Sequence, residues 1–309
     1  MEQVPAGDAA ALLHSPRDPE QGPGGPFIED LPESDPARSP ETGWRPWTAP
    51  LALIVGLVLA TVGGLVVDLP ALALGVKLTT SHTPPGLAIA DTFVQDVGFV
   101  LAAVYCAHIG RRAVRGWQLG LRRPGVGWPM AGGLVLLLLL LFVLVSVVWS
   151  QVFNPERETL LNQLGSNEGP VLLVLSAALT CVVAPICEEV LFRGYIFTAL
   201  RNWRGTLPAA ILDGLIFGGV HVGSAPALDL APLAALGFGL CLLYRATGSL
   251  YPGIFAHCLN NCIAFSSLEN WSWQLSVVIV CALGAIAGLI ALVDRLGLSA
   301  SGTLLSGSS

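Results

Sequence analysis

Long apolar runs recur along this chain and restrict it to an all-helical membrane fold. A helix needs about 20 apolar residues to cross the hydrocarbon of a bilayer. Charged side chains make up only 12% of the 309 residues, against about 25% in soluble domains. The sequence therefore predicts an all-α, polytopic, integral membrane protein with a bundle of about eight transmembrane helices. The expected helices are 47–67, 85–110, 128–149, 170–200, 207–222, 228–244, 254–265 and 271–293.

The first 45 residues differ in composition from the rest. They hold nine acidic and three basic side chains, eight prolines and five glycines. Such a segment buries too little apolar surface to fold, so we expect a disordered acidic tail over 1–45. The start has neither a basic nor an apolar leader region, and no cleavable signal peptide is expected. The other expected divisions are helices one to three at 46–165, a catalytic core at 166–268, and a last helix with a short tail at 269–309.

Basic residues fall almost entirely on one side of the predicted helices. Only Lys77 and Arg157 lie on the opposite side. By the positive-inside rule, both termini are then cytoplasmic, and the expected location is the plasma membrane if the chain is bacterial. The arginines on the expected cytoplasmic side are Arg111, Arg112, Arg115, Arg122, Arg123, Arg201, Arg204, Arg245 and Arg295.

Three ionisable side chains stand in the fourth apolar run, at Glu188, Glu189 and Arg193. An ionised residue at bilayer depth costs about 2.5–3.5 kcal/mol on insertion scales, which favours a functional site with partners. Glu189 and Arg193 are four residues apart, so on a helix they can form an ion pair. Glu188 is rotated by about 100° from Glu189 and is free to bind a water or a substrate. Pro185 is expected to kink this helix and to open space beside the carboxylates.

Two histidines lie inside later apolar helices. Phe217 and His221 share one helix face, and His257 and Asn261 share another, because each pair is four residues apart. The carboxylates and both histidines are expected at about 20–25 Å from the cytoplasmic ends of their helices. A lone histidine in a membrane helix is usually a structural hydrogen-bonding residue, but this combination favours one buried site. Gly218 and Gly219 are expected to let a neighbouring helix or substrate approach closely.

These residue types favour hydrolysis by an activated water. Glu188 in a dehydrated site can remove a proton from water, and the neutral imidazole of His221 can share it. Amide hydrolysis also needs donors for the developing oxyanion, and His257 and Asn261 supply an N–H and an NH₂ group. The Glu189–Arg193 pair would then orient the site.

The three motifs resemble, in order and spacing, those of the CPBP intramembrane proteases, also called the Abi family, which includes the type II CAAX prenyl endopeptidases. The motifs are Glu188-Glu189-x-x-x-Arg193, Phe217-x-x-x-His221 and His257-x-x-x-Asn261, and the resemblance covers about a third of the chain, 172–265. It implies a helical membrane glutamic endopeptidase in which Glu188 activates water with His221. It does not imply a CAAX substrate, because the family also includes members tied to bacteriocin immunity and abortive infection.

Other functions remain open. Histidines and glutamates are also zinc ligands, but the chain lacks a His-Glu-x-x-His motif, and Leu212-Asp213-Gly214 is a weak match to site-2-type proteases. A serine mechanism lacks a histidine partner for Ser224. A non-enzymatic scaffold or immunity protein, or a transporter, would also use buried charges. We expect no cofactor, and as partners the lipid bilayer and a membrane-embedded or membrane-anchored peptide, prenylated or not, and no nucleic acid.

Overall fold

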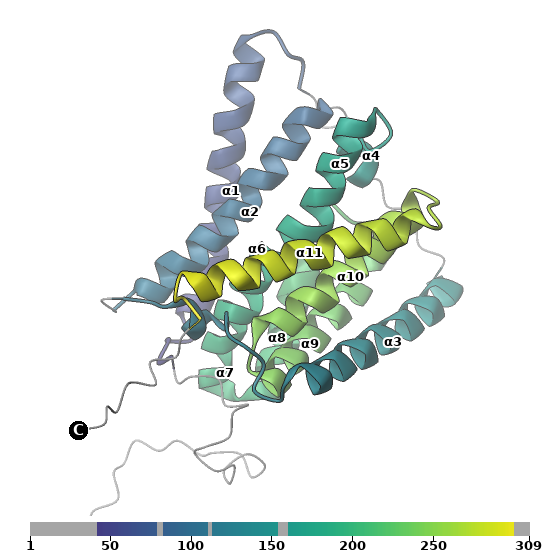
Figure 1. Cartoon of the computed structure of the whole chain (residues 1–309). Coiled ribbons are helices and arrows are strands. Elements are labelled where there is room, and N and C mark those ends of the chain that lie inside the picture. Colours follow the sequence, from purple (N-terminus) through teal and green to yellow (C-terminus); the bar gives the residue numbers. More distant parts are fainter. Residues whose placement is uncertain (1–41, 79–82, 111–112, 154–159, 300–309) are drawn as a thin grey trace, which may run out of the picture. The chain divides into compact units, whose positions relative to one another are not determined.

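The computed structural model describes residues 42–78, 83–110, 113–153 and 160–299, and within these ranges it is helical and contains no strand (Figure 1). The helices are α1 (Thr48–Ala73), α2 (Pro85–His108), α3 (Trp128–Phe153), α4 (Leu160–Gln163), α5 (Pro170–Ala178), α6 (Ala184–Glu189), α7 (Thr198–Arg204), α8 (Thr206–Gly219), α9 (Leu230–Thr247), α10 (Leu250–Leu268) and α11 (Gln274–Arg295). The segments η1 (Gly116–Leu119) and η4 (Ala227–Asp229) are 3₁₀ turns, and η2 (Leu179–Val183) and η3 (Val190–Phe197) are π-helical.

Six of the described helical segments are long and apolar enough to cross a membrane. They are α1, α2, α3, the continuous run from α5 to α7 (Pro170–Arg204, here the central helix), η4 with α9 (Ala227–Thr247), and α11. The predicted all-α, multi-pass membrane fold is therefore confirmed. Each of the eight predicted helices has a counterpart, but two of them are not among these six. Helix α8 has only 14 residues, and the continuous helix α10 carries polar side chains such as His257 and Asn261 within its apolar sequence.

The outer faces of the spanning helices are apolar. On α3, Leu140 and Leu144 are each 60% exposed, and on α1 Val66 is 66% exposed. Exposed apolar surface of this extent is the expected lining against lipid tails. On α3 the exposed leucines face outward, whereas Leu138 and Leu139 pack on the inner side against a cluster that includes Leu236 and Leu240 of α9.

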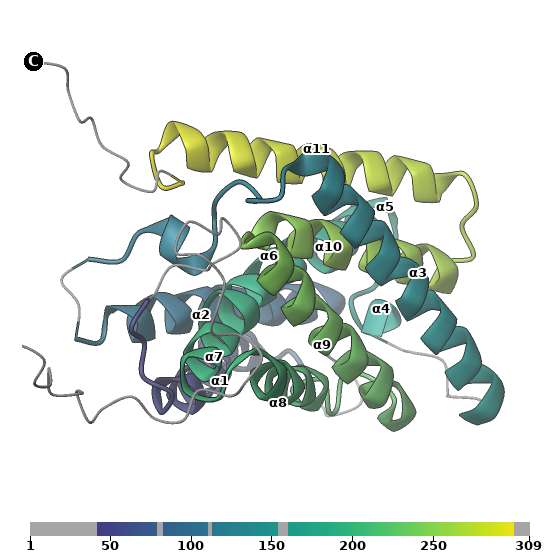
Figure 2. The ribbon, with the colours of Figure 1, turned by 90° about the horizontal axis from the view of Figure 1, so that it is seen from below.

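The central helix is surrounded by the other helices. It contacts α1 and α2 on one side and α8, α9 and α10 on another. The end-on view in Figure 2 places α3 beside α9, and α11 beside α10. Every residue of the central helix from Cys187 to Leu200 is buried as a result. The Glu188–Arg193 segment therefore lies in the protein interior and not against lipid.

The central helix contains π-helical turns on both sides of the two glutamates. Pro185 lacks an N–H and cannot donate the hydrogen bond of a regular helix. The π-helical turn η2 ends two residues before it, at Val183, and a second one, η3, starts at Val190 directly after Glu189. Wide turns of this kind are rare and occur often at functional sites.

Most of the predicted disordered tail, 1–45, lies outside the described residues, and of its last four residues Thr42 and Trp44 are buried while Gly43 and Arg45 are exposed. Trp44 is 4% exposed, and its ring lies 4.8 Å from that of Tyr195. Asn202 Nδ2 donates to Trp44 O at 3.3 Å. An aromatic ring gains much free energy from burial, so a single tryptophan anchors a segment whose average composition is polar.

Candidate active site

Arg193 is the centre of a buried charge cluster. Its Nη1 donates to Glu189 Oε1 at 2.8 Å, across the four-residue spacing seen in the sequence. Its Nη2 donates to Gly237 O on α9 at 3.1 Å, and its Nε lies 3.7 Å from Asp213 Oδ2 on α8. Arg193, Glu189 and Asp213 are all 0% exposed. One guanidinium therefore holds two carboxylates and ties three helices together.

Phe217 covers the face of this guanidinium. Its ring centroid lies 4.4 Å from Arg193 Cζ, which is close enough for a cation–π interaction. The same ring contacts Phe192 edge-on at 5.2 Å. These aromatic side chains exclude water and so strengthen the ion pairs beside them.

His257 on α10 bridges the two neighbouring glutamates. Its Nδ1 lies 3.1 Å from Glu189 Oε1, and its Nε2 lies 3.8 Å from Glu188 Oε2. An ionised carboxylate can only accept hydrogen bonds, so His257 Nδ1 carries the proton of this contact. Gly253, one turn earlier on α10, makes the approach possible, because a Cβ there would lie 2.9 Å from Glu189 Oε2.

Glu188 differs from Glu189 in that its carboxylate is left without a hydrogen bond. The side chain is 12% exposed. His257 Nε2 approaches its Oε2 to 3.8 Å, and the carboxylate makes no hydrogen bond within the described ranges. A carboxylate in this state keeps its acceptor sites for a water or a substrate.

His221 lies just beyond α8, and not inside the helix as predicted. The expected helix 207–222 ends at Gly219, and the chain turns through Gly223 with φ at +95°. His221 Nδ1 lies 2.7 Å from Phe217 O. A carbonyl oxygen only accepts, so Nδ1 is protonated, and the Nε2 of the neutral ring has a free lone pair.

The Phe217 ring joins the two histidines. Its centroid is 5.0 Å from that of His221 and 5.6 Å from that of His257. No direct hydrogen bond or ion pair links His221 to Glu188 in the described part of the chain. The contact that joins His221 to the site is therefore its packing against the Phe217 ring, whereas His257 contacts the carboxylates themselves.

Asn261 lies one turn beyond His257 on α10 and is held by two hydrogen bonds. Its Nδ2 donates to Thr180 O in η2 at 2.9 Å, and its Oδ1 accepts from Asn260 Nδ2 at 3.3 Å. One N–H of the amide remains for another acceptor. Among the residues described, no three His, Cys, Asp or Glu side chains are arranged to hold a metal ion.

The network also includes residues that the predicted site left out. Asp213 is paired with Arg193 and accepts from Cys241 Sγ at 3.0 Å. The sequence feature that could have identified Asp213 is its position four residues, or one helical turn, before Phe217, on the same helix face. Gly237 and Gly253 give no such signal, because their contributions are a backbone carbonyl and the lack of a side chain.

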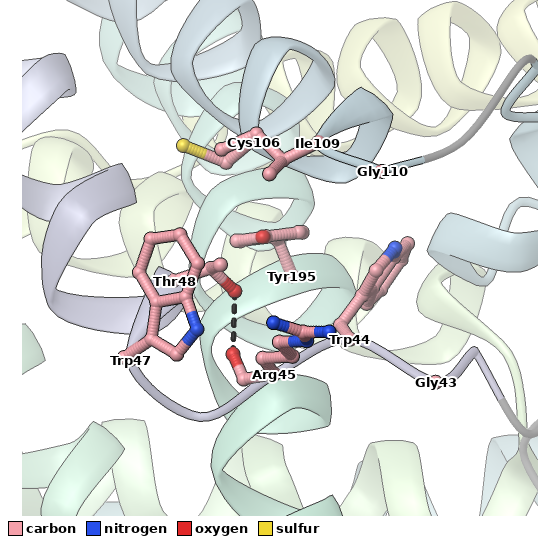
Figure 3. A pocket seen from close by; sticks show the side chains of 9 residues that line it. All are labelled: Gly43, Trp44, Arg45, Trp47, Thr48, Cys106, Ile109, Gly110 and Tyr195. Carbon is pink, nitrogen blue, oxygen red and sulfur yellow. Dashed lines mark hydrogen bonds between the residues drawn. The ribbon is translucent and has the colours of Figure 1, made fainter.

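A cavity of about 400 Å³ lies away from these residues, between the start of α1, the end of α2 and the central helix (Figure 3). Tyr195, which lines it, is six residues after Glu189, or about 9 Å along the helix. The cavity is therefore not the space beside the carboxylates. Its lining residues are Gly43, Trp44, Arg45, Trp47, Thr48, Cys106, Ile109, Gly110 and Tyr195.

Comparisons with known proteins agree with the motif resemblance. Residues 170–263 match the model of the family described as "Type II CAAX prenyl endopeptidase Rce1-like", which confirms the resemblance over this segment. A Bacillus subtilis (strain 168) protein, YdiL, described as a candidate membrane peptidase, is 31% identical over 118 residues, 36% of this chain and 46% of its own length. An uncharacterised protein of Mycoplasma capricolum is 30% identical over 95 residues, 30% of this chain and 27% of its own length. The chain thus spans about half of the first relative and about a quarter of the second. No solved structure matches it significantly.

Proposed function

We propose that this chain is an intramembrane endopeptidase that hydrolyses a peptide bond of a membrane-embedded or membrane-anchored substrate. The observation that carries the proposal is the contrast between the two adjacent glutamates. Glu189 is fully buried and paired with Arg193, whereas Glu188 is partly accessible and has no hydrogen bond within the described ranges. The ion pair holds Glu189 in place, and the neighbouring Glu188 keeps a carboxylate that can accept a proton, as a general base must. The family match supports peptide hydrolysis as the reaction.

In the proposed mechanism, Glu188 binds the attacking water and removes its proton. The free lone pair of His221 Nε2 accepts the second hydrogen bond of this water. As the water oxygen adds to the peptide carbonyl, the carbonyl oxygen becomes an oxyanion. When the oxyanion collapses, the C–N bond of the peptide breaks, and Glu188 returns the proton to the leaving amine nitrogen, so that Glu188 ends the cycle as it began. General acid–base catalysis of this kind contributes about 10²–10⁴-fold.

The oxyanion needs donors that are already in place. Asn261 has one N–H left after its bond to Thr180. We propose His257 Nε2 as the second donor, a role that requires both ring nitrogens to carry protons while Nδ1 donates to Glu189. Both side chains are oriented before substrate binds, and an oxyanion donor is worth about 10²–10³-fold in kcat. We propose that Glu189 and Arg193 act by holding His257 in this orientation.

The proposal is tested with the full chain reconstituted in vesicles. The probes are membrane-anchored, quenched fluorescent peptides, made with and without a C-terminal farnesyl group. We expect the wild type to cleave at least one of them and Glu188→Gln to leave it intact. Equal fluorescence with the wild type and the variant would contradict the proposal and favour a binding or immunity role.

The mechanism also predicts how the enzyme responds to chelators. Water activation by Glu188 and His221 involves no metal, so cleavage is expected to continue at an unchanged rate after metal depletion. The control is the same preparation with zinc added back. Activity that is lost on chelation and restored by zinc would replace this mechanism with that of a metalloprotease.

A further inference from the structure

Helix α2 brings a buried carboxylic acid close to Glu188. Asp96 is 1% exposed, and neither of its carboxyl oxygens has a hydrogen-bond partner among the described residues. Helix α2 packs on α6, and Asp96 lies within electrostatic range of Glu188 and Cys187. Asp96 lies outside the segment 170–263 that matches the family.

Among the described residues, no basic side chain forms an ion pair with Asp96. The buried guanidinium of Arg193 is paired with Glu189 and Asp213 and interacts electrostatically with Glu188, so its charge is already shared by three carboxylates. Across α2, the neighbouring Gly98 faces Leu59 and Ala60 of α1, which are apolar. An unpaired ionised carboxylate is costly in such a place, and a second carboxylate nearby raises the cost.

Asp96 and Glu188 can act as hydrogen-bond donor and acceptor for one another. A protonated carboxylic acid is neutral and has an O–H to donate. Glu188 is an acceptor without a hydrogen bond, and it lies beyond direct hydrogen-bonding distance of Asp96. A single water between the two carboxyl groups would satisfy both. Two buried carboxyl groups that hold one proton between them are a recurrent arrangement at catalytic sites.

We propose that Asp96 is a positioning residue of this site: it keeps its proton at neutral pH and donates through one water to Glu188. The pair then carries a single negative charge, on Glu188. The hydrogen bond fixes one oxygen of Glu188 and leaves the other for the attacking water. The kinetic part of this inference rests on the proposed function, whereas the protonation of Asp96 does not.

Infrared spectroscopy tests the protonation without any substrate. The full chain is placed in vesicles at neutral pH, and the C=O stretching band of protonated carboxyl groups is compared between the wild type and Asp96→Asn. We expect the band to lose intensity in Asp96→Asn and to shift in Glu188→Gln, where the acceptor has changed. The control is Asp91→Asn on the same helix, whose carboxyl lies near Gly64 of α1 and which should leave the Glu188-sensitive component in place. A band unchanged in Asp96→Asn overturns the proposal.

Kinetics with a cleaved probe peptide test the positioning. Asp96→Ala is expected to lower kcat by about 10–100-fold with KM within about twofold, because the base is misplaced while binding is kept. Asp96→Asn should restore kcat to within about threefold of the wild type, since its amide keeps a donor. Thermal unfolding of both variants in detergent checks that each is folded. Equal losses in the two variants, or no loss in Asp96→Ala, would overturn the role. If the wild type cleaves no probe, the proposed function fails, and the infrared result still decides the state of Asp96.

Discussion

Adjacent glutamates acquire different properties in this protein because the helix turns them toward different neighbours. Glu189 is held by Arg193 at 2.8 Å and by His257 at 3.1 Å. Glu188, one residue earlier, is approached by His257 at 3.8 Å and has no hydrogen bond within the described ranges. The sequence predicted this division of roles from the spacing of Glu189 and Arg193 alone. It did not predict that His257 is the histidine in contact with both carboxylates.

At the scale of single residues, Glu188→Gln tests the proposed general base most directly. The amide keeps the volume of the side chain and removes only the base, so cleavage should fall by about 10²–10⁴-fold. The midpoint of thermal unfolding in detergent should stay at the wild-type value. A folded variant with wild-type turnover would remove Glu188 from the mechanism.

Arg193→Ala should act on stability as well as on rate. The substitution leaves Glu189 and Asp213 buried without their common partner, and breaking a buried pair costs about 3–5 kcal/mol. Denaturant unfolding in detergent measures this cost. The matched control is Arg204→Ala at the end of the same helix, where the side chain is exposed and the loss should be small. Equal unfolding free energies for the two variants would show that the charge cluster adds nothing to stability.

At the scale of elements, the position of α8 against α9 depends on glycines. A Cβ at Gly218 would lie 2.6 Å from Leu230 O, and one at Gly214 would lie 2.7 Å from Ala234 O. Gly219 has nothing within 4 Å of the same position. Close approach was expected equally at Gly218 and Gly219, because only the contacts between helices reveal which of two successive residues faces the neighbouring helix.

Gly218→Ala should therefore displace α8 from α9. The new methyl group meets backbone and not a flexible side chain, and overpacking of this kind costs about 1–3 kcal/mol. Gly219→Ala is the control and should be neutral or slightly stabilising, because alanine favours helix. Unfolding of the two variants in detergent gives the comparison. Equal behaviour would contradict the close packing of α8 on α9.

Helix ends were harder to predict than helix identities. His221 was placed inside a helix, since the apolar run continues to Val222, but the turn at Gly223 ends α8 at Gly219. Trp44 was assigned to the tail on composition, although it packs on Tyr195. In both cases a contact or turn at one residue outweighs the average character of its segment.

At the scale of the whole molecule, arginines from separate connections gather at one end. Arg201 at the end of the central helix lies within electrostatic range of Arg122 and Arg245. Arg201 and Arg245 lie in the last turns of α7 and α9, so the 14-residue α8 runs away from this end before α9 returns to it. This clustering supports the predicted orientation.

Reporter fusions test the orientation directly. The positive-inside rule places the arginine-rich end in the cytoplasm and Lys77 on the opposite side. A reporter inserted at Lys77 should read as external, and one fused after Ser309 should read as cytoplasmic. Matching signals from the two positions would refute the topology.

The central claim is that Glu188 makes this chain a peptidase of membrane substrates. The most direct measurement is a proteomic comparison of peptide termini in the membrane fraction of host cells that produce either the wild type or Glu188→Gln at equal levels. We predict new termini that occur only with the wild type, together with an uncut precursor that accumulates with Glu188→Gln. Identical sets of termini in the two membranes, with both proteins folded and present, would contradict the account.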